Sequence, residues 1–230
     1  MNIAIIPARG GSKRIPKKNI KNFCGTPIIN WSIKAALESK YIDLVIVSTD
    51  DSEIASIAIE SGAIVPFIRP SYLADDYTVL NKVIVHALKE VSKIYKDISY
   101  VCSILPTAPL IRRKDIDKAF ENLCANESCD FIFSVTNFSF PIQRALKINK
   151  ESQISMFYPE HLNTRSQDLD KAWHDAGQFY WGKTSAWLEE KNLFSSKTLP
   201  FKLPGYRVQD IDNMEDWHRA ELIFKMLRET

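Results

Sequence analysis

The residues of this 230-residue chain that are best suited to chemistry stand together near its start, in residues 7–19. Two adjacent glycines, Gly10 and Gly11, allow the backbone to approach a ligand closely and leave amide groups exposed. Cationic side chains surround this pair at five positions, namely Arg9, Lys13, Arg14, Lys17 and Lys18. Amide donors and cations together suit a polyphosphate, so we expect the segment to bind one; a solvated basic loop is the alternative.

A short apolar run, residues 2–6, directly precedes this loop and predicts a buried strand. Ligands of open α/β sheets bind beyond the carboxyl ends of the strands, which is where the loop begins. The loop is not a P-loop, because no Gly-Lys-Ser/Thr opens a helix at the right spacing. It also lacks the third glycine of a dinucleotide fingerprint. The sequence therefore predicts a phosphate site of another kind.

Asp210 and Asp212 are the second group of residues with a clear chemical use. Alternation along an extended segment places both carboxylates on the same side. Paired carboxylates suit Mg²⁺, which takes one or two of them together with phosphate oxygens and water. We expect a magnesium site at these residues; one ordinary acid beside a helix cap is the alternative.

The composition describes an ordinary globular protein, with 45% hydrophobic and 25% charged residues. A net charge of +2 gives no bulk reason to bind nucleic acid or an acidic membrane. No apolar stretch approaches the roughly 20 residues of a membrane helix. Cysteine spacing shows no metal-type pairs, and no signal peptide is visible. We therefore expect a cytoplasmic protein with four reduced thiols, at Cys24, Cys102, Cys124 and Cys129.

Strand and helix patterns alternate over the first two-thirds of the chain. Strands are predicted at 2–6, 44–47, 64–67, 100–105, 131–135 and 178–181, and helices at 27–39, 51–61, 78–94, 114–125 and 215–227. Asp50 or Asp51 is expected to cap the second helix. This rhythm predicts one α/β domain, residues 1–230, with a mostly parallel sheet between two helical layers. The aromatic and polar segment 137–176 breaks the rhythm and is predicted to be a recognition insertion.

The loop sequence I-I-P-A-R-G-G-S-K-R-I-P-K-K-N resembles the signature of the CMP-sialic acid synthetase family. V-I-V-S-T-D-D at 45–51, F-I-R-P at 67–70 and Q-D-I-D at 209–212 resemble further motifs of that family. The resemblance implies a nucleotide-diphospho-sugar transferase fold and transfer of CMP from CTP to a nonulosonic acid sugar. It implies CTP contacts at Ala8, Arg9, Gly10, Gly11, Ser12, Lys13, Lys18, Asn19 and Arg69, and Mg²⁺ on Asp210 and Asp212. Arg9, Lys18 and Asp212 are the expected catalytic residues.

The insertion resembles the branch of this family that acts on pseudaminic acid, in residues 140–145, 163–169 and 174–182. Leu105 stands where the sialic acid enzymes usually have a glutamine, and His174 stands near the place of an arginine. The expected sugar-binding residues are Leu105, Gln143, Arg144, Arg165, His174 and Gln178. His174 is also a candidate general base, although a structural histidine is an equal alternative.

The resemblance also implies a homodimer whose insertion reaches toward the partner's active site, and a role in bacterial surface glycans such as glycosylated flagellin. Several alternatives stay open from the sequence. In one alternative the sugar substrate is N-acetylneuraminic or legionaminic acid. In another alternative it is 3-deoxy-manno-octulosonate. A catalytically silent nucleotide-binding module would not need the Asp210–Asp212 pair. A glycosyltransferase of this fold type would carry Asp-X-Asp after the fourth strand, where this chain has Leu105-Pro106-Thr107.

Overall fold

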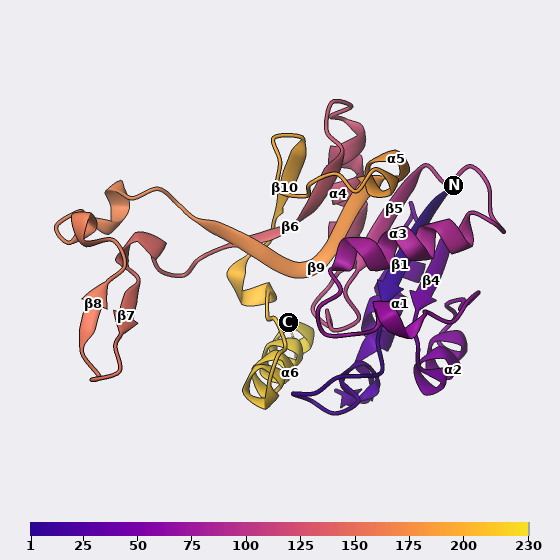
Figure 1. Cartoon of the computed structure of the whole chain (residues 1–230), viewed down its shortest axis with the longest axis horizontal. Coiled ribbons are helices and arrows are strands. Elements are labelled where there is room, and N and C mark those ends of the chain that lie inside the picture. Colours follow the sequence, from indigo (N-terminus) through magenta and orange to yellow (C-terminus); the bar gives the residue numbers. More distant parts are fainter. Residues whose placement is uncertain (230) are drawn as a thin grey trace.

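A central six-stranded sheet organises the protein, whose computed structural model describes residues 1–229 (Figure 1). The strand order is β10-β6-β9-β5-β1-β4, and every neighbouring pair is parallel except the two pairs made by β9. This confirms the predicted mostly parallel sheet. The strands are β1 (Asn2–Pro7), β4 (Leu44–Ser48), β5 (Tyr100–Ile104), β6 (Phe131–Asn137), β9 (Trp173–Lys183) and β10 (Thr198–Lys202).

Helices cover both faces of this sheet, because the side chains of its strands alternate between two apolar cores. Ala4 and Ile6 of β1 belong to the core under one set of helices: α1 (Ile28–Leu37), α2 (Ser52–Glu60) and α4 (Arg113–Cys124). Ile3 and Ile5 belong to the opposite core, under α3 (Leu80–Val91) and α5 (Thr184–Leu188). The three-layer α/β/α architecture is therefore as predicted.

The prediction of a strand at 64–67 is wrong. Only two isolated bridges form there, from Ile64 to Ile46 and from Ile68 to Thr49. Pro66 has no backbone N–H to donate between them, which prevents a continuous ladder. The sheet gains an edge strand instead in β10, which sequence reasoning did not predict. Pro200 lies within β10 and is tolerated because the outer side of an edge strand needs no partner.

A third apolar cluster fixes the last helix, α6 (Met214–Glu229), against the small hairpin of β2 (Asn22–Phe23) and β3 (Thr26–Pro27). Trp217 and Phe224 of α6 both meet the ring of Phe23 edge-on, with centroids 5.3 and 5.4 Å apart. Ile15 and Ile211 complete the same cluster. Because Ile211 lies between the two predicted metal ligands, this packing ties them to the first loop.

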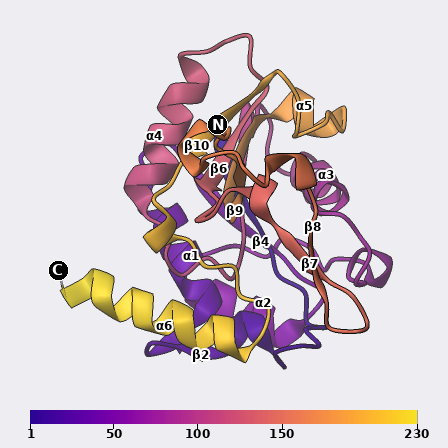
Figure 2. The ribbon, with the colours of Figure 1, turned by 90° about the vertical axis from the view of Figure 1, so that its left-hand side faces the viewer.

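The predicted insertion is an arm that leaves the body between β6 and β9 (Figures 1 and 2). Asn137 pairs with Trp173 at its root, and we call residues 138–172 the arm. The last four residues of the predicted insertion, 173–176, belong to β9. The tip is the hairpin of β7 (Leu146–Ile148) and β8 (Ile154–Met156). Single-turn helices complete the chain: η1 (Lys18–Ile20), η2 (Ser71–Leu73), η3 (Ile142–Arg144), η4 (Pro159–His161), η5 (Ser166–Asp168) and η6 (Gly205–Arg207).

Two smaller findings concern the cysteines and the helices. The four cysteines are free thiols, and Cys102 and Cys129 are buried. Within residues 1–229, no helix is both long enough and apolar enough to cross a membrane.

Candidate functional site

The carboxyl ends of β1, β4 and β5 meet at one edge of the sheet, because the three strands run parallel. A pocket of about 280 Å³ opens at this edge. Six of the residues predicted to bind the nucleotide line it, together with Leu105 and one predicted metal ligand: Arg9, Ser12, Lys13, Lys18, Asn19, Arg69 and Asp212. The structure thus brings residues from both ends of the chain into one site.

The first part of the loop is fixed by backbone contacts to β4 and the turn after it. Ala8 N donates to the Ser48 carbonyl (2.9 Å), and Gly10 N donates to Asp50 Oδ1 (3.1 Å). A Cβ at Gly10 would lie only 2.7 Å from Asp51 Oδ2, so this position needs glycine. Asp51 is unable to withdraw, because its carboxylate caps α2 by accepting from two amides of the first turn. The predicted cap is therefore confirmed at Asp51.

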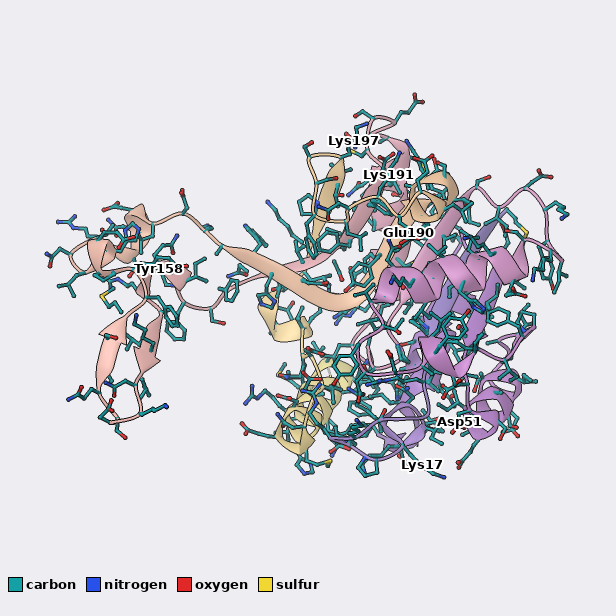
Figure 3. The ribbon with its side chains drawn as sticks, in the orientation of Figure 1. Lys17, Asp51, Tyr158, Glu190, Lys191 and Lys197 are labelled. Carbon is teal, nitrogen blue, oxygen red and sulfur yellow. The ribbon has the colours of Figure 1, made fainter. Side chains whose placement is uncertain are left out.

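The second part of the loop turns inward at Lys17, which has a left-handed backbone (φ 52°). Lys17 itself points outward to Glu53, and Figure 3 shows it at the same end of the body as Asp51. The next residue, Lys18, is drawn in: its Nζ donates to the Ile211 carbonyl (2.6 Å). Asn19 is buried, and its Nδ2 donates to the Arg9 carbonyl (2.9 Å). Asn19 therefore holds the two halves of the loop together.

Lys18, Asp210 and Asp212 act on one another electrostatically. Burial lowers the pKa of Lys18, and the negative charges of both aspartates oppose that effect. Partial burial and the charge of Asp212 raise the pKa of Asp210. Lys18 Nζ lies 3.9 Å from Asp212 Oδ1, which also accepts from Arg14 (2.7 Å). The Asp212 carboxylate thus contacts two cations of the first loop.

The donor chemistry of this pair fits a magnesium ion. Among residues 1–229, no group of three or more histidine, cysteine, aspartate or glutamate side chains forms a closed metal cage. Mg²⁺ does not need one, since it takes one or two carboxylates and fills its remaining positions with phosphate oxygens and water. Asp210 and Asp212 beside a phosphate-binding loop provide this arrangement.

Asp216 supports the two predicted metal ligands, Asp210 and Asp212, which we call the metal pair, and it was not predicted from the sequence. Its Oδ2 accepts from the amides of Asp212 (3.1 Å) and Asn213 (3.2 Å). In return, Asn213 Oδ1 accepts from the Asp216 amide (3.0 Å). This reciprocal pair is a capping box at the start of α6. The pattern Asn-x-x-Asp directly after the metal pair is the signal that identifies it.

We expect Asp216→Ala to loosen the metal pair, because Asp212 would lose the acceptor of its amide. Loss of a helix cap costs about 1 kcal/mol, and we expect the melting temperature to fall by about 2–4 °C. The Mg²⁺ concentration for half-maximal turnover should rise several-fold. Glu215→Ala is the matched control, since Glu215 is exposed and pairs with Arg219 on the same helix. An unchanged Mg²⁺ requirement in the Asp216 variant would show that the cap does not position the pair.

Arg69 is buried at the base of the pocket, with 4% of its surface exposed. Its guanidinium donates to the carbonyls of Ser48 (2.9 Å) and Leu73 (3.3 Å). Among residues 1–229, its Nε–H has no hydrogen-bond partner. A buried donor without an acceptor is costly, and a pyrimidine carbonyl would satisfy it. This observation fits the predicted contact with the base.

Two acidic residues that were not predicted contact the cations of the loop. Arg9 Nη1 lies 2.8 Å from Asp76 Oδ1, and Lys13 pairs with the other oxygen of that carboxylate. Arg9 also donates to the Asp75 carbonyl. The sequence shows these residues as an acidic pair, Asp75 and Asp76, between the F-I-R-P motif and the third helix. Nothing in the sequence places this pair opposite Arg9.

The predicted sugar-binding residues do not come together in one chain. Leu105 lines the pocket, and its amide donates to the carbonyl of Gln178 (2.9 Å). The Gln178 side chain is buried and donates to the Arg207 carbonyl (2.8 Å), so it braces the segment that leads to Asp210. His174 lies at the root of the arm, where its ring packs on Phe138 with centroids 4.7 Å apart.

The other three predicted sugar residues lie on the arm. Gln143 donates to the Asp170 carbonyl (3.1 Å), and Arg144 donates to the Thr164 carbonyl (2.6 Å). Arg165 is exposed. None of the three lines the pocket of its own chain. Figure 3 shows the separation, since Tyr158 of the arm lies far from Lys17 of the loop.

Cations and carboxylates gathered around one pocket at the carboxyl edge of a sheet are what a nucleotidyl transfer needs, because charge develops on phosphates during the reaction. The protein is thus of the nucleotidyltransferase class. More narrowly, the chain belongs to the cytidylyltransferase family, which it matches over residues 3–214.

Relatives of known function support this assignment. The chain is 43% identical over 229 residues to the pseudaminic acid cytidylyltransferase of Campylobacter jejuni, covering 100% of this chain and 98% of that one. It is 36% identical over 209 residues, 91% of this chain, to a Helicobacter pylori protein named pseudaminic acid cytidylyltransferase and UDP-2,4-diacetamido-2,4,6-trideoxy-beta-L-altropyranose hydrolase, of which it covers 40%.

A solved structure supports the fold independently. CMP:2-keto-3-deoxy-manno-octonic acid synthetase in complex with CTP superimposes with a TM-score of 0.72 at 16% identity, covering 100% of this chain and 99% of that one. An identity this low establishes a shared fold and no more. The predicted nucleotide-diphospho-sugar transferase fold is therefore confirmed.

Proposed function

We propose that this protein transfers CMP from CTP to the anomeric hydroxyl of pseudaminic acid and releases pyrophosphate. The observation that carries the proposal is the pocket itself, in which the loop cations, the buried Arg69 and the Asp212 carboxylate converge beside Leu105. The 43% identity to the Campylobacter jejuni enzyme over 229 residues supports the choice of sugar. The reaction would take place in the cytoplasm and serve surface glycans such as those on flagellin.

CTP would bind with its triphosphate on the loop. The loop cations that line the pocket are Arg9, Lys13, Arg14 and Lys18, and Ser12 lines it with them. The base would lie toward Arg69, whose free Nε–H offers a donor to a pyrimidine carbonyl. Asn19 would hold the loop in this conformation through its hydrogen bond to the Arg9 carbonyl.

Asp210 and Asp212 would hold Mg²⁺ when CTP is bound. The ion would supply charge neutralisation at the α-phosphate and the leaving pyrophosphate. Lys18, held in place by the Ile211 carbonyl, would add a positive charge beside the same phosphates. The sugar hydroxyl attacks the α-phosphorus directly, so no side chain has to form a covalent intermediate.

The arm would supply the remaining sugar contacts to a second copy of the chain. Its surface is unusually apolar for an exposed segment: Phe140 is 83% exposed, and Ile148, Ile154 and Leu162 are also exposed. Burial against a partner would remove this surface from water. A homodimer would bring Gln143, Arg144 and Arg165 to a pocket that the arm does not reach in its own chain.

The choice of sugar gives a direct test of the proposal. The apolar Leu105 beside the pocket suits a sugar with a deoxygenated terminus, since a hydroxyl placed there would lack a partner. An unpaired buried polar group costs about 1–3 kcal/mol, so kcat/KM for pseudaminic acid should exceed that for N-acetylneuraminic acid by at least about tenfold. Leu105→Gln should reduce the ratio of the two kcat/KM values, mainly by lowering kcat/KM for pseudaminic acid. Pyrophosphate release with pseudaminic, neuraminic and legionaminic acids measures it, and equal use of all three by the unmodified protein would refute the sugar assignment.

A further inference from the structure

The carboxylate of Asp76 forms ion pairs with Arg9 and Lys13, two of the cations in the pocket that is expected to bind the polyphosphate. Arg9 Nη1 lies 2.8 Å from its Oδ1, and Lys13 pairs with its Oδ2, so each oxygen receives one cation. Both cations also line the pocket. Hydrogen bonds from Lys13 and Arg9 lower the pKa of Asp76, which is therefore ionised at neutral pH. An anion of the protein itself thus pairs with two of the cations that are expected to bind phosphate oxygens.

Asp76 belongs to a short connection that is held mainly by this contact and by its own turn. The connection lies between η2 and α3 and forms neither a helix nor a strand. The Asp75 side chain accepts from the amides of Tyr77 (3.0 Å) and Thr78 (2.6 Å), and the Asp75 carbonyl accepts from Arg9. Tyr77, the next residue, is 90% exposed. Few apolar contacts therefore resist a displacement of Asp76.

We propose that Asp76 is an internal counter-ion that competes with the polyphosphate for Arg9 and Lys13. This inference rests on the proposed function, because it assigns the triphosphate to these cations. Without a ligand, the carboxylate keeps the two cations in place and offsets their mutual repulsion. When CTP binds, phosphate oxygens replace the carboxylate, and Asp76 moves to water. After the transfer, its return to Arg9 and Lys13 favours release of pyrophosphate.

The magnitudes fit a competitor of moderate strength. Partly exposed ion pairs contribute little each, so their loss on binding should weaken polyphosphate affinity by about three- to tenfold. Asp212 contacts Arg14 and Lys18 in a similar way. Asp212 is also a candidate metal ligand, however, and its replacement would change two things at once. Asp76 is not a candidate metal ligand, so its substitution tests the counter-ion effect alone.

Binding of inorganic triphosphate, measured by calorimetry without Mg²⁺, tests the inference with a probe that needs neither cytidine nor sugar. Asp76→Asn should bind it about three- to tenfold more tightly than the unmodified protein. Asp76→Glu, which keeps the charge, should stay close to the unmodified protein. Glu53→Gln is the matched control: Glu53 pairs with Lys17 of the same loop, but Lys17 does not line the pocket, so the affinity should not change.

Kinetics provide the second readout, since pyrophosphate should inhibit Asp76→Asn at a correspondingly lower concentration. Thermal melts of all variants would identify a misfolded one, and Asp76→Glu then remains as the comparison. Equal or weaker triphosphate binding by folded Asp76→Asn would overturn the inference. That result leaves the proposed function standing as long as the unmodified protein turns over CTP, so the two failures are distinguishable.

Discussion

Asp212→Asn should lower turnover of CTP by about 100-fold or more, because the variant keeps the size of the side chain but removes one negative charge from the metal pair. Asp212 is the carboxylate of that pair that lines the pocket. Its Oδ1 also receives Arg14 at 2.7 Å, so asparagine leaves one hydrogen-bond acceptor for the arginine. CTP binding in the absence of Mg²⁺ should not weaken. The measurement is initial rate against Mg²⁺ concentration.

Glu215→Gln is a suitable control for this variant, since Glu215 is an exposed acid three residues further on that does not line the pocket. A near-normal rate of Asp212→Asn in saturating magnesium would show that the metal assignment is wrong. A loss of the fold would appear in a thermal melt and is not expected, because the Asp212 side chain is 41% exposed.

Lys18→Ala should raise the CTP concentration needed for half-maximal rate by about 10- to 100-fold, since a hydrogen bond to a charged group contributes about 1.5–3 kcal/mol. Burial lowers the pKa of Lys18 in the free protein. A phosphate beside it would stabilise the charged form, so removal of the amine leaves that phosphate without a partner. Steady-state kinetics with CTP as the varied substrate measure the effect.

Lys17→Ala is the matched control, because it removes a cation from the neighbouring position of the same loop. Lys17 pairs with Glu53 outside the pocket, so CTP use should be nearly unchanged. Equal effects of the two substitutions would indicate that the loop acts through its total charge only. In that case the inward position of Lys18 would have no special role.

Local patterns in the sequence were sufficient for the parts of the site that follow strands directly. The loop after β1 carries its glycines and cations within a few residues, and its place beyond a strand end follows from the α/β rhythm. Asp210 and Asp212 do not follow a strand, but they could be proposed as a pair from local sequence alone, since two residues in alternation define a shared face. Asp51 was readable as a helix cap because capping depends on the adjacent residues alone.

Contacts between segments that are distant in the sequence could not be predicted from local patterns. Asp76 meets Arg9 across 67 positions of sequence, and only the packing of the chain brings them together. The strand predicted at 64–67 failed because Pro66 interrupts the ladder that its apolar neighbours suggest. The sugar contacts on the arm were predicted through resemblance. The distance of these residues from the pocket depends on how far β6 and β9 extend, which short-range periodicity does not encode.

The central claim is transfer of CMP to a sugar, and the products of one reaction test it most directly. The unmodified protein is incubated with CTP, Mg²⁺ and pseudaminic acid, and the products are followed by phosphorus NMR and mass spectrometry. We predict equal amounts of CMP-pseudaminic acid and pyrophosphate, with no pyrophosphate formed when the sugar is omitted. Unchanged CTP in the complete mixture, or hydrolysis of CTP that does not depend on the sugar, would contradict the account.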